Sequence, residues 1–330
     1  MKLLVTGGAG YIGSVVASQL VEAGHETVVL DNLSKGYERA VPEGARFVKG
    51  DLLDARRLRG VLGEGFDGVL HFAALSEVAE SVEQPGRYYK NNVCGTLEVL
   101  EAMREAGAKR LVFASTAAVY GEPEEVPVTE SATPLPTNPY GASKLAADHL
   151  IGHEAAAHGL AAASLRYFNV AGASGRFGNA DASSPQIIPV TFQVAVGRRV
   201  AVEIFGTDYP TRDGTAVRDF IHVEDLGRAH LLALEAAEEG KHLVYNLGNG
   251  AGFTVNEVVE AARQVTGKPI RAVESARRPG DPAVVVASSQ KIQAELGWKP
   301  EKPDLETMIS DAWDWIKVHS HEYEPGSAGD

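Results

Sequence analysis

The sequence predicts an α/β protein in which a doubly wound parallel sheet is followed by a smaller C-terminal α/β domain. Three observations lead to this fold class: strand-like apolar runs that alternate with helical stretches, near-continuous apolarity in runs such as LLVT, TVVL and LVFA, and a glycine-rich turn after the first run. Strands that helices cover on both faces need such continuous apolar runs. We expect the first domain over residues 1–170 and the second mainly over residues 171–330, with some segments returning to the first.

Each element follows from a local pattern. Apolar β-branched runs predict strands, apolar residues at helical spacing predict helices, and Gly24 closes the first helix. Strands are expected at Lys2–Thr6, Glu26–Leu30, Arg46–Val48, Gly68–Phe72, Arg110–Ala114 and Ala161–Tyr167, and helices at Tyr11–Ala23, Ala55–Leu62, Gly95–Ala106, Asn138–His158, Phe253–Thr266 and Leu305–Val318. After Phe168 the alternation breaks into a segment rich in glycine, alanine and serine, which places the domain change there.

Composition and charge exclude several classes of function. The formal net charge of −13 opposes a nucleic-acid partner, because such binding needs a basic surface. We expect no membrane partner, because the chain has no signal peptide and no run of about 18 apolar residues. Cys94 is the only cysteine, and the pair His149 and His153 lacks the glutamate of a zinc motif. We therefore expect a soluble, cytoplasmic protein without a metal.

The glycine-rich turn predicts a dinucleotide site in a Rossmann domain. Gly7, Gly10 and Gly13 follow the first strand at intervals of three, which suits a tight turn, a pyrophosphate close to the backbone and a helix packed on the sheet. Asp31 ends the second strand, 18 residues after Gly13. A carboxylate there binds an adenosine ribose and repels a 2′-phosphate, so NAD is favoured over NADP. The alternative is that Asp31 only caps the turn that follows it.

Two further strand ends are candidates for contacts with the dinucleotide. Asp51 stands just after the third strand, where it can reach adenine, and the run HFAA, His71–Ala74, ends the fourth strand beside the expected pyrophosphate. For Asp51 the sequence leaves a second interpretation open, because aspartate is also common at helix N-caps.

Tyr140, Lys144 and Thr116 are the candidate catalytic residues. Tyr140 and Lys144 are four residues apart and share one face of a helix, so the lysine ammonium favours the tyrosine phenolate. Free tyrosine titrates at about pH 10, so a base that works near neutrality needs a lowered pKa. Thr116 ends the fifth strand and offers a hydroxyl that can share the proton of a substrate. The alternative is a solvated Tyr/Lys pair and a core threonine.

Several longer motifs add a resemblance to a known family. TGGAGYIG, DNLS, HFAA, STAAVYG, YGASK, LRYFNVAG, FGTDYPTRDGTAVRDFIHVEDL and YNLG together resemble the nucleotide-sugar epimerases of the extended short-chain dehydrogenase/reductase family, from about Met1 to about His319. The resemblance implies a tightly bound NAD and a UDP-hexose substrate. Tyr140 would take the proton of the sugar 4-hydroxyl with help from Thr116, the C4 hydride would pass to NAD, and the 4-keto sugar would turn over before the hydride returns. UDP-glucose and UDP-galactose would thereby be interconverted.

The resemblance also implies a set of binding residues and a homodimer. The implied cofactor contacts are Tyr11, Ile12, Asp31, Asn32, Asp51, Leu52, Phe72, Ala73, Asn91 and Phe168, with Lys144 on the nicotinamide ribose. The implied nucleotide-sugar site consists of Asn169, Gln186, Phe205, Arg218, Arg278 and Asp281. Guanidinium groups suit a diphosphate, to which Arg277 could also contribute, and Phe205 can stack on uracil. The dimer would form through the helices at Gly95–Ala106 and Asn138–His158.

Departures from the family pattern keep some alternatives open. Val285 stands where some members carry a bulky tyrosine, which leaves room for an N-acetyl sugar, so UDP-N-acetylhexosamines are further candidate substrates. A nucleotide-sugar 4,6-dehydratase or decarboxylase is a second candidate class. The dehydratases typically carry Asp-Glu after the strand-end threonine, where this chain has Ala117 and Ala118. An NAD-sensing regulator is the third class, but such proteins tend to lose the tyrosine or lysine that this chain retains.

Overall fold

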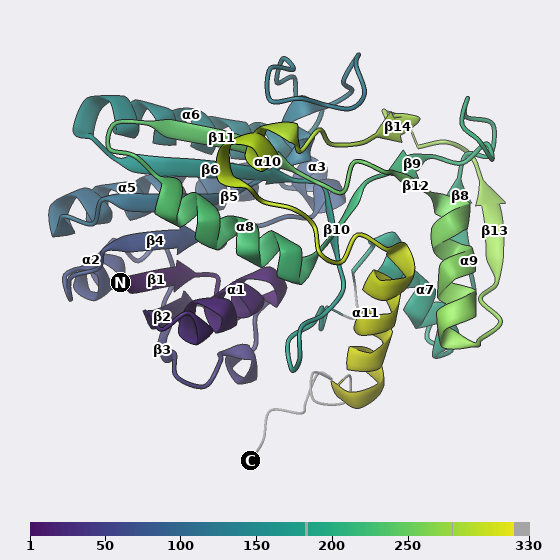
Figure 1. Ribbon diagram of the computed structural model, residues 1–330, viewed down its shortest axis with the longest axis horizontal. Helices are drawn as coiled ribbons and strands as arrows, with labels where there is room; N and C mark the ends of the chain where they lie inside the picture. The colour runs from purple at the N-terminus through teal and green to yellow at the C-terminus, as the bar shows by residue number, and fades with distance from the viewer. Residues whose placement is uncertain (182–183, 279, 320–330) are drawn as a thin grey trace.

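A seven-stranded parallel sheet forms the centre of the larger part of the molecule (Figure 1). The computed structural model describes residues 1–181, 184–278 and 280–319. The strands are β1 Lys2–Thr6, β2 Glu26–Asp31, β3 Arg46–Lys49, β4 Gly68–His71, β5 Arg110–Thr116, β6 Ala161–Tyr167 and β11 His242–Leu247. They lie in the order β11-β6-β5-β4-β1-β2-β3. This order confirms the predicted doubly wound sheet, in which the first strand is central and the chain winds outward in both directions.

Helices cover both faces of this sheet, and the strand residues alternate between the two cores. On one face, α2 Ala55–Leu62, α5 Gly95–Ala106 and α6 Pro139–His158 pack over Leu4 and its neighbours. On the other, α1 Tyr11–Glu22, α8 Val223–Ala236 and α10 Gln290–Leu296 pack over Leu3 and Val5. These three strand residues are fully buried, which explains why the strand reads as a continuous apolar run.

The smaller part of the molecule lies beside the carboxyl ends of these strands (Figure 1). Its strands are β7 Asn169–Ala171, β8 Val202–Phe205, β9 Val217–Arg218, β10 Phe220–His222, β12 Phe253–Thr254, β13 Ala272–Ser275 and β14 Val284–Val285. Its helices are α7 Ile187–Ala195, α9 Val255–Thr266 and α11 Leu305–His319. The pairs β10-β7 and β13-β8 and the three-stranded sheet β12-β9-β14 surround a core that includes Phe192, Val258 and Trp313.

Differences from the expected elements lie mainly at their ends. The helix expected from Phe253 begins at Val255, because Phe253–Thr254 pairs with β9 and Thr254 then forms a capping box with Glu257. Strand β5 runs two residues further than expected and so ends at Thr116. Elements without a prediction include α3 Val78–Glu83, α4 Pro85–Tyr88, the short 3₁₀ turns η1 Glu38–Ala40 and η3 Ala117–Tyr120, and a π-helical turn, η2 Tyr89–Cys94.

The second half of the chain contributes to both parts of the molecule. Strand β11 joins the large sheet beside β6, and α8 packs against α1. Within the described residues, no helix combines the length and the apolarity that crossing a membrane requires.

Candidate active site

The site residues gather at one edge of the large sheet because parallel strands end on the same side. Thr6 of β1, Asp31 of β2, His71 of β4, Thr116 of β5 and Tyr167 of β6 are the last residues of their strands. In doubly wound sheets this carboxyl edge, next to the point where the strand order reverses, is where ligands bind.

The glycine turn after β1 brings the start of α1 very close to the sheet. Gly7 has φ +71°, and a Cβ there would lie 2.5 Å from the backbone nitrogen of Ala73. A Cβ at Gly13 would lie 2.3 Å from the Gly7 carbonyl oxygen, so only glycine permits this packing. At Gly10 the nearest such atom is 3.4 Å away, which leaves the turn open on that side.

The first turn of α1 has the properties of an anion site. Its N-cap, Gly10, has no side chain to accept a hydrogen bond, and no partner for the N–H groups of Tyr11, Ile12 and Gly13 occurs among the described residues. A helix N-terminus with unpaired N–H groups attracts phosphate. These residues therefore fit the pyrophosphate of a dinucleotide.

Asp31 binds the glycine turn and the turn that follows β2. Its Oδ2 accepts from the N–H of Ala9 at 3.0 Å and its Oδ1 from the N–H of Leu33 at 2.8 Å. Burial raises the pKa of Asp31, and these two N–H groups act in the opposite direction. Asp31 therefore caps its turn, as the alternative interpretation held, while its carboxylate also lies against the glycine turn, where a ribose would bind.

Asp51 lies beside the same turn and does not cap helix α2. Its Oδ2 accepts from Asn32 Nδ2 at 2.8 Å, which brings together two of the residues expected to contact the adenosine. Helix α2 is capped by Asp54, whose side chain accepts from the N–H of Arg57 at 3.0 Å. The N-cap interpretation of Asp51 is therefore wrong for this helix.

The other expected cofactor residues lie around the same edge. Phe72 and Ala73 both donate their N–H groups to the Thr6 carbonyl oxygen, at 2.9 and 3.1 Å. Leu52 is buried beside Gly95 of α5. Asn91 lies on η2, and Phe168 is buried directly after β6. Together with the glycine turn and Asp31, this donor and acceptor set fits NAD.

Thr116, Tyr140 and Lys144 meet at the end of β5. Helix α6 begins just before Tyr140, because Asn138 caps it by accepting from the N–H of Gly141 at 2.9 Å. Thr116 Oγ1 accepts from the N–H of Ala118 at 3.1 Å, which leaves its O–H for the hydrogen bond that it makes with Tyr140. The structure therefore brings the three predicted residues into one place.

The electrostatics of the pair differ from the expectation. Burial raises the pKa of Tyr140, and the hydrogen bond from Thr116 only partly offsets this effect. The ammonium of Lys144 donates to the Ala114 carbonyl oxygen at 2.8 Å and lies 4.6 Å from the centroid of the Phe113 ring. Burial lowers the pKa of Lys144 to about 7. The expected lowering of the Tyr140 pKa by Lys144 is thus absent in the protein alone, because burial opposes both charges.

Four of the six residues expected in the nucleotide-sugar site lie in two contacting pairs. Arg218, at the end of β9, forms an ion pair with Asp281 on the loop before β14. The guanidinium of Arg278, from the same loop, lies 3.7 Å from the centroid of the Phe205 ring. The neighbouring Arg277 instead pairs with Asp208 at 2.7 Å, a residue outside the expected set.

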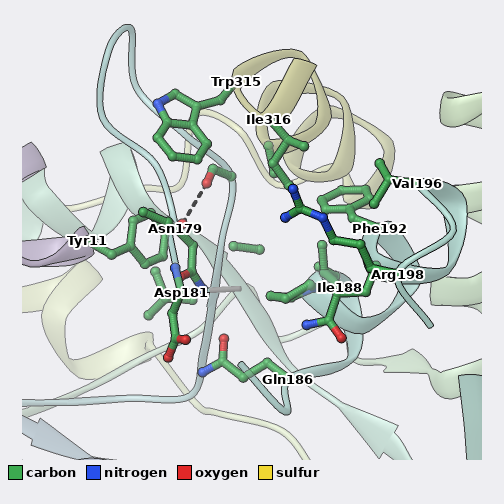
Figure 2. A pocket seen from close by; sticks show the side chains of 17 residues that line it. Tyr11, Asn179, Asp181, Gln186, Ile188, Phe192, Val196, Arg198, Trp315 and Ile316 are labelled. Carbon is green, nitrogen blue, oxygen red and sulfur yellow. Dashed lines mark hydrogen bonds between the residues drawn. The ribbon is translucent and has the colours of Figure 1, made fainter. Parts of the chain in front are cut away.

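Asn169 and Gln186 occupy separate positions. Asn169 begins β7 and donates to the Asp219 carbonyl oxygen at 2.9 Å. Gln186 is the residue just before α7 and lines a cavity of about 100 Å³ between α7, α11 and the start of α1 (Figure 2). Tyr11 borders this cavity and donates its hydroxyl to the Gly172 carbonyl oxygen at 2.6 Å, the dashed line in Figure 2. None of the three candidate catalytic residues lines the cavity.

Asn92 is a site residue that the sequence analysis missed. Its side chain is buried, accepts from the N–H of Leu75 at 2.9 Å, and donates to the Leu75 carbonyl oxygen and to Ser143 Oγ, both at 3.0 Å. Asn92 thereby fixes the loop after β4 against helix α6 one turn from Tyr140. No local pattern marks Asn92 in the sequence, because its partners are the distant Leu75 and Ser143.

The fold and the glycine turn after β1 define a class of protein, the NAD-dependent enzymes built on a doubly wound sheet. The family model described as the NAD dependent epimerase/dehydratase family matches residues 3–248, and the chain belongs to this family.

Individual relatives agree with this assignment. The UDP-glucose 4-epimerase of Streptomyces lividans is 57% identical over 325 residues, which are 98% of each protein. A crystal structure of a UDP-glucose 4-epimerase superposes with a TM-score of 0.94 at 44% identity, over 100% of both chains. The UDP-glucose 4-epimerase from Brucella ovis in complex with NAD has a TM-score of 0.91 at 41% identity, over 95% of this chain and 98% of that one.

Proposed function

We propose that this chain is an NAD-dependent isomerase that interconverts UDP-glucose and UDP-galactose by inverting C4 of the sugar. The observation that carries this proposal is the meeting of Thr116, Tyr140 and Lys144 at the end of β5, beside a glycine turn that is open to a dinucleotide. Residues 1–170 hold NAD and residues 171–330 mainly hold the nucleotide sugar, while α8, β11 and α10 return to the large sheet.

In the proposed reaction, Tyr140 moves the proton of the sugar 4-hydroxyl in both directions. The Tyr140 oxygen accepts the proton as the C4 oxygen becomes a ketone, and Thr116 supports the ionised phenol through its hydrogen bond. Lys144 holds a positive charge on the same helix face. Bound NAD supplies the acceptor and then the donor of the C4 hydride. After the 4-keto sugar has turned over, Tyr140 returns the proton, and C4 is inverted without net oxidation.

The nucleotide half of the substrate is assigned to the second part of the chain. Arg218 and Arg278 neutralise the diphosphate, Asp281 accepts ribose hydroxyls, and Phe205 stacks on uracil. The ion pair between Arg218 and Asp281 and the stacking of Arg278 on Phe205 support this assignment, because both contacts hold the binding groups close together before substrate arrives.

The residues after Thr116 favour epimerisation over dehydration. Ala117 and Ala118 form the start of η3, so no acid stands there to expel the C6 hydroxyl. Val285 lies in the same apolar cluster as Ala117 and Phe168. Its small side chain supports acceptance of the N-acetyl group of a UDP-N-acetylhexosamine.

We also propose a cytoplasmic homodimer. Helices α5 and α6 pack against each other and are joined by Arg104 and Glu154 at 3.1 Å, and Leu97 of α5 is exposed beside them. Two copies of this helix pair would form a four-helix interface, which the mass measured by sedimentation would test. The single cysteine suits a reducing compartment.

To test the proposed function, the purified protein is incubated with UDP-galactose without added cofactor. Proton NMR should show the equilibrium mixture with UDP-glucose, and acid-denatured protein should release NAD. A 4-keto-6-deoxy product would instead identify a dehydratase, and no turnover of any UDP-hexose would contradict the proposal. UDP-N-acetylgalactosamine in the same assay tests the role of Val285.

A further inference from the structure

The carboxylate of Asp148 lies in the core, one helical turn after Lys144 on α6. Its Oδ2 accepts from Ser115 Oγ at 3.1 Å and from Arg166 Nε and Nη2 at 3.1 and 3.0 Å. The Asp148 residue is 2% exposed, and its Oδ1 has no hydrogen-bond partner in the part of the chain that the structure describes. A buried carboxylate with one unpaired oxygen is costly, so its place beside the site calls for a physical reason.

Lys144 is also a buried charged group, and its charge is positive. It is 3% exposed, hydrogen-bonds a neutral carbonyl and lies over the Phe113 ring, and no carboxylate among the described residues forms an ion pair with it. Burial lowers its pKa, and Asp148 is the charge that acts against this effect. His71, which faces Lys144 from β4, stays neutral because burial and Lys144 lower its pKa to about 3. Tyr140 faces the same space from α6.

Charged and titratable groups from other strands also face Asp148. Arg166 from β6 donates two hydrogen bonds to it and in turn donates to the Tyr120 hydroxyl at 3.0 Å. His242 from β11 also faces Asp148, and burial lowers the pKa of this histidine, so the histidine stays neutral at neutral pH. The ion pair matches the Asp148 carboxylate with a buried guanidinium, since either charge alone would be strongly unfavourable there.

We propose that Asp148 is a positioning residue that acts through Lys144, because it places a buried carboxylate one helical turn from the buried Lys144 ammonium on the same helix. Asp148 itself touches neither NAD nor the sugar. This inference rests on the function proposed above, in which Lys144 must be cationic while Tyr140 accepts the proton.

The variant pair Asp148→Asn and Asp148→Glu tests the charge separately from the hydrogen bonds. An asparagine oxygen can still accept from Ser115 and Arg166, whereas glutamate also keeps the charge. In Asp148→Asn the midpoint of the basic limb in the pH profile of kcat should shift to lower pH by about one unit or more. At pH values above this midpoint, kcat should then be about tenfold lower than in the wild type. In Asp148→Glu the limb should stay close to the wild-type position.

The ionisation of Lys144 can be read directly by NMR in protein labelled with ¹³C at the lysine ε-carbons. The Lys144 resonance is assigned by its absence from Lys144→Met. Its titration midpoint should fall in Asp148→Asn by the same amount as the kinetic limb. Asp148→Ser gives the same readout if the asparagine variant does not fold.

An unmoved Lys144 titration, with a rate lowered evenly at all pH values, would overturn the inference and leave Asp148 a merely structural residue. The NMR readout does not require turnover. An inactive wild-type enzyme would therefore refute the proposed function, and the titration would still decide the role of Asp148.

Discussion

At the scale of single residues, burial works against the chemistry that Tyr140 and Lys144 share. Removing a phenolate and an ammonium from water disfavours both charged forms, and the directions of the two pKa shifts agree with this. The hydrogen bond from Thr116 and the carboxylate of Asp148 act in the opposite direction on one partner each. Neither effect outweighs burial, so both groups remain shifted toward their neutral forms.

Tyr140→Phe removes the proposed base with almost no change of shape. We expect kcat for UDP-galactose to fall by a factor on the order of 10² or more, because general acid–base catalysis typically contributes that much. NMR gives the rate, and the NAD content should remain that of the wild type. Tyr245→Phe is the matched control, since Tyr245 lies on β11 and its hydroxyl donates to Glu295 at 2.7 Å. Equal rates in the two variants would contradict the assignment.

Arg277 and Arg278 form a natural comparison for substrate binding. Both are exposed and both stack on an aromatic ring, at 4.1 Å from Tyr209 and 3.7 Å from Phe205. Only Arg278 has no carboxylate partner in the described residues, since Arg277 pairs with Asp208. Arg278→Ala should raise KM for UDP-galactose about tenfold, the loss of one charge-assisted contact, whereas Arg277→Ala should change it little. Steady-state kinetics of both variants measure these KM values. A larger rise in KM for Arg277→Ala than for Arg278→Ala would contradict the assignment.

At the scale of the elements, the sequence predicted those helices and strands whose bounds depend on local residue patterns. The strands up to β6 and the helices α1, α2, α5 and α6 were expected almost residue for residue, since burial on both faces and helical periodicity leave a clear signal. The end of β5 at Thr116 and the start of α9 after Thr254 depend on pairing with distant strands. Sequence patterns carry little information on such non-local pairing, and the same holds for β11, which joins the sheet beside β6.

The residues of the candidate site fall into the same two groups, those marked by a local motif and those defined by distant contacts. Gly7, Asp31 and Tyr140 stand in motifs whose chemistry can be read locally. Asn92 and Asp148 could not be found in this way, because their roles arise from burial and from partners more than about 15 residues away, such as Ser143 and Arg166. The sequence also does not reveal how deeply Tyr140 is buried, which is why the predicted direction of its pKa shift was wrong.

Gly13→Ala tests the contact between helix α1 and the glycine turn. The added Cβ would lie 2.3 Å from the Gly7 carbonyl oxygen, so the helix start must move and the open N–H groups lose their alignment. We expect protein that folds but carries at least about tenfold less NAD, as measured on the denatured protein. Gly60→Ala is the control: the α2 glycine has nothing within 4 Å, so alanine should stabilise the helix slightly. Full NAD content in Gly13→Ala would exclude this turn as the phosphate site.

At the scale of the whole molecule, the two parts of the chain are joined at the cofactor side. Tyr11 of the glycine turn donates to the Gly172 carbonyl oxygen, and α8 packs on α1 while its N-cap, His222, contacts Asp311 of α11 at 3.2 Å. A ligand that orders the glycine turn therefore also acts on the second part of the molecule through these contacts. Stability and occupancy by NAD are linked for the same reason, since a ligand that binds only the folded state stabilises it.

His230 gives the molecule a pH-dependent stability. It is fully buried on α8, donates from Nδ1 to the Leu226 carbonyl oxygen at 2.9 Å, and packs 4.8 Å from Phe72 and 6.0 Å from Tyr167, ring centroid to centroid. Burial lowers its pKa to about 4, while the Leu226 carbonyl acts weakly in the opposite direction. In the unfolded chain the histidine titrates at about 6.5. The unfolded state therefore takes up a proton first as the pH falls, and the stability contributed by neutral His230 is present above about pH 6.5 and lost progressively toward about pH 4.

Replacing His230 with leucine removes this titration. Between about pH 7 and about pH 5 the wild type should lose about 2 kcal/mol more of its free energy of unfolding than His230→Leu does. Urea denaturation at both pH values measures the difference, with NAD at the same saturating concentration because bound ligand also stabilises the fold. The comparison concerns the change with pH, so a constant loss of stability from the substitution cancels. Parallel losses in the two proteins would mean that His230 is protonated in the folded state, and that the apolar packing against Phe72 and Tyr167 does not keep it neutral.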